Sequence, residues 1–324
     1  MQPDNDKLTI GLAGDVMIGR SLDGIISQEG YPYPWGDVLP LLKSTDINII
    51  NLETTLTHSN RVVEKVFNFK AMPDKVNTLT EANVTVANLA NNHILDFSEE
   101  GLAETINTLD VAGIRHVGAG MNIEEAVMPE IIFKKNIHVG VLGFTDNEPS
   151  WKASEEKSGT NYISISKTKD REYALTAIEK LKKNLDILIV TIHWGYNMQQ
   201  KPSSAFIDFA HQMIMHGADI IHGHSAHIFQ AIEVYERKLI LYDTGDFVDD
   251  YVVHEDLRND LSFYFLIKAS KTAVEQLHLI PVMINNYQVN LAKDENYKWC
   301  IKRMQQLSKK FATEIKDDGK VLLQ

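Results

Sequence analysis

Residues 217–230, GADIIHGHSAHIFQ, hold the end of a helix, a short strand and three histidines in that order. Gly217 suits the C-cap of the preceding helix, because glycine adopts the left-handed conformation without strain. Asp219–Ile221 indicates a short buried strand. His224 and His227 follow that strand directly. This order is typical of α/β proteins, in which ligands bind beyond the carboxyl ends of strands.

The same order recurs along the first two thirds of the chain. Short apolar runs bounded by turn residues predict further buried strands, at Leu8–Ala13, Ile47–Leu52, Val84–Leu89, Ile137–Phe144 and Ile187–Ile192. Segments of helical period lie between them, at Ser98–Ala112, Asp170–Asn184 and Ser203–Gly217. Ser98 stands where its side chain could cap the first of these helices.

The pattern changes after about residue 228. The later elements are antiparallel strands and a last helix: a hairpin of Phe229–Tyr235 and Leu239–Tyr242, strands at Leu261–Lys268 and Val274–Ile284, and a helix from about 294 to 311. No linker, low-complexity tract or repeat marks a boundary. We therefore predict one α/β domain over residues 1–324, with a mixed, two-layer sheet core and antiparallel strands from about residue 229 onward.

Composition places the chain among ordinary globular proteins, with 44% apolar and 23% charged residues. Asp and Glu number 44 against 32 Lys and Arg, which gives a net charge of −12. This acidity argues against a nucleic-acid partner, because phosphate backbones are bound by basic faces. An anionic substrate, whether a small molecule or a polymer, would have to be held by local charge such as a metal ion.

Three features bear on location. The single cysteine, Cys300, cannot form an internal disulfide. No run of about 18 apolar residues is present, so we expect no membrane span. The N-terminal sequence MQPDNDKLTI is polar and lacks a hydrophobic signal core. These features favour a cytoplasmic protein as the sequence stands, and an exported or membrane-associated one if a leader has been removed.

Polar side chains follow five of the predicted strands. They are carboxylate, amide and imidazole groups, at Asp15, Glu53, Asn92 with His93, His193, and His224 with His227. We expect them at one rim, because the carboxyl ends of parallel strands meet there. Mn, Zn, Fe and Mg ions bind through mixtures of such ligands, and two ions about 3.5–4 Å apart would suit this many. The sequence thus predicts a site for one or two divalent metal ions.

Each of these residues also has a structural alternative. Asp15 could serve a turn, Glu53 could be a solvated loop carboxylate, and Asn92 could occupy a left-handed turn. His193 could be a hydrogen-bonded rim histidine. Only the joint placement favours a metal site. His222 is expected either to be structural or to support the ligands from behind, because its side chain should alternate away from the side of Gly223.

Other catalytic motifs are missing from the sequence. No phosphate-binding G-x-x-x-x-G-K-[ST] loop appears, and no G-x-G-x-x-G follows the first strand. No G-x-S-x-G elbow appears, and Cys300 lies in a helical segment without a nearby histidine. Serine and cysteine hydrolases are therefore disfavoured.

The motifs together resemble the bacterial capsule-synthesis family of the CapA or poly-γ-glutamate synthesis type, which is similar to calcineurin-like metallophosphoesterases. The resemblance runs from about Leu8 to Val248. It is carried by GDVMIGR, NLETTLT, LANNHILDFSEEGL, HWG with the later Pro202, GADIIHGHSAHIFQ and LYDTGDF. It implies an α/β/β/α sandwich with mixed sheets.

The resemblance also implies residue roles. Metal ligation is implied for Asp15, Glu53, Asn92, His193, His224 and His227, with Glu53 bridging two ions. His93 takes the place of the acid beside the leaving group. Asp96 could hydrogen-bond the His93 ring and set its tautomer, or could instead cap the helix that starts near Ser98.

Two departures from the family pattern bear on function. Phosphoesterases usually have a histidine where Met17 stands, so the first metal site is short of one ligand, as it tends to be in this family. The family often has asparagine where Asp246 stands, and the carboxylate could change the charge or metal preference of the rim.

Two functions stay open on this evidence. A metal-dependent hydrolase of phosphoester or related bonds would use a water activated by the metal, with His93 as general acid. Arg20 could neutralise an anionic substrate oxygen or form a surface salt bridge. Alternatively, the same ligands could serve a non-catalytic, metal-binding accessory protein in the synthesis or export of an anionic capsule polymer such as poly-γ-glutamate. The presence of His93 favours the enzyme, whereas Met17 favours the accessory role.

Overall fold

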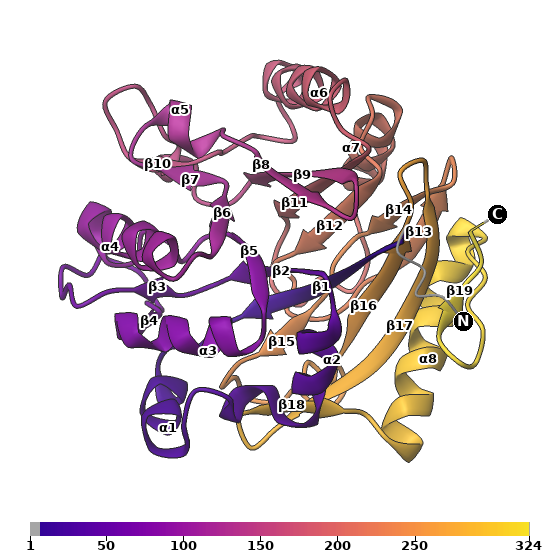
Figure 1. The fold of residues 1–324 in the computed structure, drawn as a ribbon, viewed down its shortest axis with the longest axis horizontal. Helices are drawn as coiled ribbons and strands as arrows, with labels where there is room; N and C mark the ends of the chain where they lie inside the picture. The colour runs from indigo at the N-terminus through magenta and orange to yellow at the C-terminus, as the bar shows by residue number, and fades with distance from the viewer. Residues whose placement is uncertain (1–6, 324) are drawn as a thin grey trace.

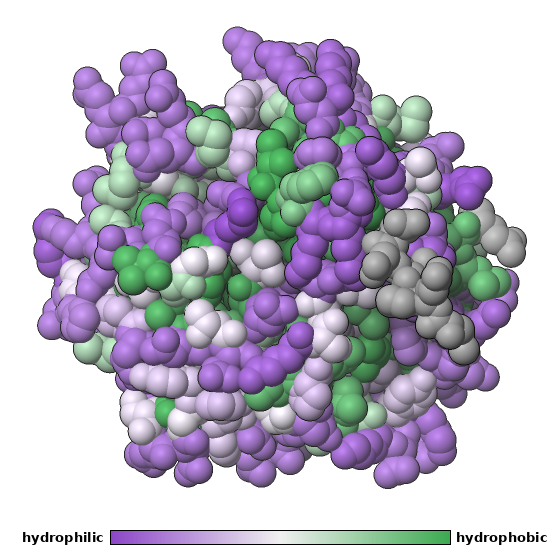
Figure 2. All heavy atoms as spheres, in the orientation of Figure 1, coloured by the Kyte–Doolittle hydropathy of each residue, from purple (hydrophilic) through white to green (hydrophobic). Residues whose placement is uncertain are grey.

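The computed structural model describes residues 7–323; the polar start of the chain, residues 1–6, and Gln324 lie outside the described residues. Two mixed β-sheets pack against each other, and helices cover their outer faces (Figure 1). The expected α/β/β/α sandwich with mixed sheets is confirmed. Hydrophilic side chains cover most of the face seen in Figure 2. Among residues 7–323, we find no helix with the length and apolar character to cross a membrane.

The first sheet joins the N-terminal parallel strands to the C-terminal antiparallel ones. Its order is β18 (Gln288–Leu291), β17 (Val274–Asn285), β16 (Leu261–Ala269), β1 (Leu8–Val16), β2 (Ile47–Leu52), β5 (Val84–Asn88) and β6 (Arg115–Val117). Strands β1, β2, β5 and β6 run parallel, and β16 pairs antiparallel with β1. Two short strands attach to it, β15 (Asp246–Val248) beside β1 and β19 (Lys320–Val321) beside β17.

The second sheet has a parallel centre and antiparallel edges. Its order is β13 (Ile232–Tyr235), β14 (Lys238–Leu241), β12 (Ile220–His224), β11 (Ile187–His193), β9 (Ile137–Thr145) and β8 (Glu130–Lys134). The predicted hairpin of β13 and β14 turns at Glu236 and Arg237, whose φ angles of 49° and 60° suit a type I′ turn. Two small sheets flank the sandwich, formed by β3 (Thr55–Leu56) with β4 (Lys70–Ala71), and by β7 (Ala119–Gly120) with β10 (Gly159–Thr160).

The helices form two outer layers. Those on the first sheet are α1 (Ser21–Glu29), α2 (Leu39–Ser44), α3 (Val76–Glu81) and α4 (Ser98–Val111). Those on the second sheet are α6 (Thr168–Lys182) and α7 (Ser204–Met215), whereas α8 (Asp294–Ser308) packs on β13, β16 and β17 (Figure 1). The short helix α5 (Ile123–Ala126) lies beside β7 and β10. Single 3₁₀ segments lie at Tyr33–Val38, Pro73–Lys75, Pro149–Trp151 and Lys309–Phe311.

Strand β2 shows how alternation builds the layers. Ile47 and Ile49 belong to a core cluster that includes the strands of the second sheet, whereas Ile50 and Leu52 belong to a cluster with α1 to α4. Successive side chains of a strand point to opposite faces, so a central strand must be apolar on both. This explains why the continuous apolar runs of the sequence identify strands correctly.

One local expectation is wrong. Ser98 does not cap α4, because it has a φ of 62° and its hydroxyl donates instead to the carbonyl of Arg61. No side chain caps this helix start. The expected glycine at the end of α7 is confirmed, since Gly217 has a φ of 117° and its N–H donates to the carbonyl of Ile214.

A buried tyrosine ties three strands of the first sheet together. Gly11 on β1 leaves room for the ring of Tyr264 from β16, since a Cβ at Gly11 would lie 1.7 Å from the Tyr264 hydroxyl. That hydroxyl donates to Asn48 Oδ1 on β2 at 2.6 Å and lies 2.8 Å from Thr45 Oγ1. The amide of Asn48 in turn donates to the carbonyl of Leu42 at 2.9 Å. This network fixes β1 and β2, whose ends carry site residues.

We expect Tyr264→Phe to lower the free energy of unfolding by about 1–3 kcal/mol, because it leaves Asn48 Oδ1 buried without its donor. Urea denaturation followed by circular dichroism measures this loss. The control is Tyr31→Phe, whose hydroxyl bonds Asp74 at the exposed surface and should change stability by less than about 0.5 kcal/mol. Equal stability of the two variants would show that the network does not hold the strands.

Candidate metal centre

The carboxyl ends of strands from both sheets meet at one place. Six of the predicted site residues come together there, and each is at most 5% exposed: Asp15, Glu53, His93, His193, His224 and His227. Asp15 lies near the end of β1, whereas His193 and His224 are the last residues of β11 and β12. The sandwich therefore places a carboxylate of one sheet against imidazoles of the other.

The first potential ligand group consists of Asp15, His193 and His224, whose ligand atoms all lie within 4.8 Å of one another. The two histidines are register partners on neighbouring parallel strands, and their Nδ1 atoms are 2.9 Å apart. His224 Nε2 lies 2.8 Å from Thr191 Oγ1, so its Nδ1 faces the centre. The amide of Asn51 donates to Asp15 Oδ1 at 2.8 Å and lies 3.3 Å from His193 Nδ1. Nitrogen atoms converging on one point in this way suit ligands of a common ion.

The second group consists of Asp15, Glu53 and His227, again within 4.8 Å of one another. His227 Nδ1 lies 3.3 Å from Asp15 Oδ2, 3.9 Å from Glu53 Oε2 and 2.8 Å from Asp246 Oδ1. Asp15 is thus the member common to both groups. Glu53 also reaches toward the first group, since its Oε1 lies 4.0 Å from His193 Nε2.

Several buried oxygens at the centre lack hydrogen-bond partners, and this indicates whether a metal ion would fit there. Asp15 Oδ2, both Glu53 carboxylate oxygens and Asp246 Oδ2 have no hydrogen-bond partner among the described residues. Burying carboxylate oxygens without partners is costly, and a cation is what compensates it. The residues therefore fit one or two divalent ions. Asn92 Oδ1 is also buried and unpartnered, but no described contact joins it to either group.

The electrostatics of the centre are those of crowded, buried charges. Burial opposes the charged form of Asp15, but His227, whose Nδ1 lies 3.3 Å from Asp15 Oδ2, holds the pKa of Asp15 below the usual range. Burial, and then the charge of Asp15, raise the pKa of Glu53 well above its usual value. Burial lowers the pKa of His193 to about 3 and that of His224 well below its ordinary value, which favours the neutral form of both rings. Neutral imidazole is the form that binds a metal.

His93 lies beside the centre without belonging to either ligand group. Its Nδ1 lies 2.6 Å from Asp96 Oδ2, and its Nε2 lies 3.8 Å from Glu53 Oε1. The ring of Phe69 stacks on it at 3.8 Å. Asp96 also accepts from the Phe69 N–H at 2.7 Å and pairs with Lys65 Nζ at 2.9 Å. Of the two alternatives for Asp96, the structure therefore has the contact with His93 and not the helix cap.

Arg20 lies at the edge of the centre, with its side chain 40% exposed. Its Nε is 3.4 Å from Asp250 Oδ1. Its guanidinium also lies over the rings of Phe69 and Tyr251, at 5.5 and 6.0 Å from their centroids. Arg20 thus forms a salt bridge, which is one of its two expected roles. It also lies close to the two aromatic rings that pack on His93 and His227.

Sequence reasoning missed several neighbours of the site. Asn51 is expected at the end of its strand but not as a partner of Asp15, with which it pairs across β1 and β2. Lys65, Phe69 and Tyr251 come from irregular segments, where no periodic pattern places a side chain. His222 is buried, lies 3.4 Å from Thr191 Oγ1 and packs edge-on against the ring of His224 at 5.3 Å.

The comparisons with known proteins give a family, several relatives in sequence and similar solved structures. The family described as bacterial capsule synthesis protein PGA_cap matches residues 9–251. A probable polyglutamine synthesis accessory protein of Mycobacterium tuberculosis is 31% identical, over 97% of this chain and 95% of its own length. The capsule biosynthesis protein CapA of Bacillus anthracis is 33% identical, over 76% of this chain and 61% of its own.

A solved structure, that of a hypothetical protein from Thermus thermophilus, covers 87% of this chain and 96% of its own. It has a TM-score of 0.46 and 11% sequence identity. The family assignment therefore depends on the sequence relatives.

We predict that His224→Ala weakens divalent-metal binding at least 10-fold while the protein stays folded. Changes to residues that only orient ligands already cost about 10–100-fold, so loss of a ligand should cost no less. Metal content after dialysis against Mn²⁺, measured by elemental analysis, tests this. The control is His138→Ala, at an exposed histidine paired with Asp186. Unchanged metal content in His224→Ala would place the ligand elsewhere.

Proposed function

The chain belongs to the bacterial capsule synthesis protein family, and from this premise we propose that it is a metal-dependent hydrolase of the metallophosphoesterase type. Its substrate would be a phosphoester or a related bond in capsule or poly-γ-glutamate metabolism. The names of the relatives support the link to capsule polymers. The observation that carries the hydrolase is the position of His93, backed by Asp96 and 3.8 Å from Glu53.

The metal would be held by residues from both sheets: Asp15, Glu53, His193, His224 and His227, with Asn92 as a further candidate. Ions of the Mn, Zn, Fe or Mg class would supply Lewis acidity there and lower the pKa of a water molecule. Asn51 orients Asp15, and Thr191 orients His224, so these two act as positioning residues.

His93 is suited to deliver a proton to a leaving group. Asp96 holds the Nδ1 side of the ring, which directs Nε2 toward the centre. Phe69 stacks on one face of the ring and restricts its rotation. Lys65 pairs with Asp96 and also donates to the backbone carbonyl of Asn92, so it fixes the segment that carries His93. A histidine placed in this way is a general acid whose geometry is set before the substrate arrives.

Arg20 would bind the anionic part of the substrate. Its guanidinium stands over the ring of Phe69, which stacks on His93. A planar guanidinium suits carboxylate and phosphate oxygens. Because Arg20 also pairs with Asp250, its guanidinium would contact both the Asp250 carboxylate and the substrate.

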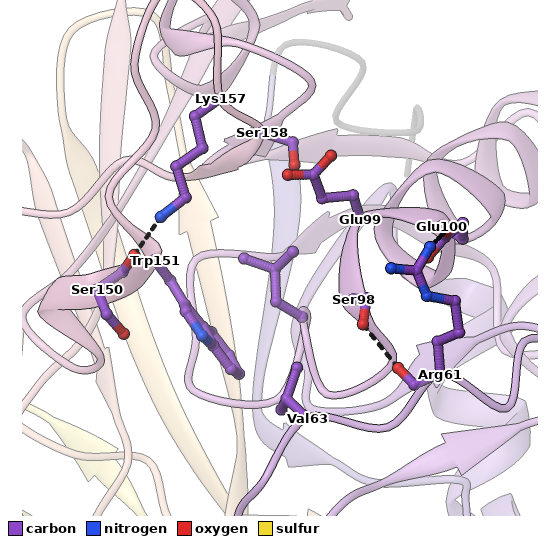
Figure 3. Close-up of a pocket in the computed structure, with 10 residues that line it drawn as sticks. Arg61, Val63, Ser98, Glu99, Glu100, Ser150, Trp151, Lys157 and Ser158 are labelled. Carbon is purple, nitrogen blue, oxygen red and sulfur yellow. Dashed lines mark hydrogen bonds and ion pairs between the residues drawn. The ribbon is translucent and has the colours of Figure 1, made fainter.

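A specific observation supports the second candidate, a polymer-binding accessory protein. A pocket of about 410 Å³ is lined by Arg61, Lys157 and Trp151, together with Val63 and, from α4, Glu99 (Figure 3). Trp151 also lies 4.8 Å from Lys65 Nζ, so this pocket adjoins the residues that hold Asp96. Two cations beside an aromatic floor suit an anionic chain, although Arg61 is already paired with Glu100.

The direct test is hydrolysis of an aryl phosphate by protein that has been stripped with a chelator and reloaded with Mn²⁺, Zn²⁺, Fe²⁺ or Mg²⁺. We expect turnover with at least one metal and none after chelation. Absence of turnover with all four metals would favour the accessory role, which binding of poly-γ-glutamate without cleavage would then support.

Within the hydrolase, His93→Ala should lower turnover of an alkyl phosphate, which has a poor leaving group, by about 10²–10⁴-fold. The loss should be smaller on an activated aryl phosphate, whose leaving group needs little protonation. Bound metal should be unchanged. The matched control is His211→Ala, which removes a histidine paired with Glu233 at 2.9 Å outside the centre. Equal losses on both substrates would remove His93 from the acid role.

A further inference from the structure

The hydroxyl of Tyr251 lies buried beside the metal centre, and no described residue of the centre forms a hydrogen bond with it. It is shielded from solvent and makes no hydrogen bond among the described residues. The ring packs edge-on against His227, with centroids 5.1 Å apart at 77°, and lies 5.9 Å from the ring of Phe69. Tyr251 thus touches a candidate ligand on one side and the residue that stacks on His93 on the other.

The backbone holds Tyr251 firmly in this place. Asp249 Oδ1 accepts the Tyr251 N–H at 2.8 Å, directly after β15. The next carboxylate, Asp250, accepts the Ser21 N–H at 3.1 Å and pairs with Arg20. Farther along, Asn259 Oδ1 accepts the His254 N–H at 2.7 Å, which closes the segment on itself. The unpartnered hydroxyl is therefore the result of a built position and not of a loose loop.

The Tyr251 hydroxyl is suited to donate a hydrogen bond, because a phenol carries its proton at neutral pH. A phenol that keeps its proton can donate, whereas the neighbouring carboxylates can only accept. A buried donor without an acceptor is destabilising, so the arrangement is best explained by an acceptor that arrives with a ligand.

We propose that the Tyr251 hydroxyl donates a hydrogen bond to an anionic oxygen of the group bound at the centre, a tetrahedral oxyanion of the phosphate type. This inference rests on the proposed function in one respect, that the centre binds its metal and an anionic group. The hydrogen bond requires no bond breaking by Tyr251, and the proton stays on the phenol. Tyr251 would select for an oxygen with negative charge, since a charged acceptor forms the stronger hydrogen bond.

The test uses Tyr251→Phe, which removes the hydroxyl and keeps the ring contacts with His227 and Phe69. The probe is inorganic phosphate, titrated into Mn²⁺-loaded protein by isothermal calorimetry. We expect phosphate to bind about 10-fold more weakly or worse, as loss of a hydrogen bond to a charged group implies. Metal content should not change, and the melting temperature without phosphate should not fall, because the hydroxyl has no partner to lose. The control is Tyr287→Phe, at a tyrosine that is 39% exposed, and it should bind phosphate like wild type.

The outcomes separate this inference from the proposed function. Weaker phosphate binding in Tyr251→Phe, with no hydrolysis by wild type under any metal, would keep the inference and overturn the hydrolase. Equal phosphate affinity in Tyr251→Phe and wild type would overturn the inference, even in an active enzyme. Loss of metal in Tyr251→Phe would also overturn it, because the hydroxyl would then serve the ligands. Failure of wild type to bind phosphate at millimolar concentration would do the same.

Discussion

The contact between His193 and His224 is the constraint on which the rest of the site depends. Their Nδ1 atoms lie 2.9 Å apart because the two residues end neighbouring parallel strands in register. Asp15 faces them from the first sheet, so the sandwich brings together groups that neither sheet could assemble alone. Burying them without an ion leaves carboxylate oxygens unpartnered. These buried carboxylates therefore destabilise the folded protein, and a bound metal ion would offset that free energy.

The parts of the structure that the sequence predicts well are those in which one physical rule dominates. Strand β2 runs over Ile47–Leu52, as predicted, because isoleucine and leucine on both faces mark a strand buried on both sides, even though Asn48 and Asn51 are buried within it. The site residues at strand ends follow from the same rule, since the carboxyl ends of parallel strands meet at one edge. The predicted helix cap at Ser98 is wrong because the Ser98 hydroxyl donates to the carbonyl of Arg61, which is distant along the chain.

The side chains that surround the metal centre are a different case. Lys65, Phe69 and Tyr251 lie in loops whose paths depend on hydrogen bonds to distant residues, such as that from the Phe69 N–H to Asp96. No periodicity in the sequence encodes such a path. These residues nevertheless decide how His93 is held and what the centre can bind. In this chain, the strands that build the scaffold can be predicted from sequence, whereas the loop side chains around the site have to be located in the structure.

The central claim is that Asp15, His193 and His224 share an ion at the junction of the two sheets. Anomalous diffraction at the manganese edge, from crystals of the full chain grown with Mn²⁺, tests it most directly. The account predicts an anomalous peak between these three residues, at ligand distances near 2.0–2.3 Å, with a second peak beside Glu53 and His227 if two ions bind. No peak at this junction, while Mn²⁺ is bound elsewhere in the same crystal, would contradict the account.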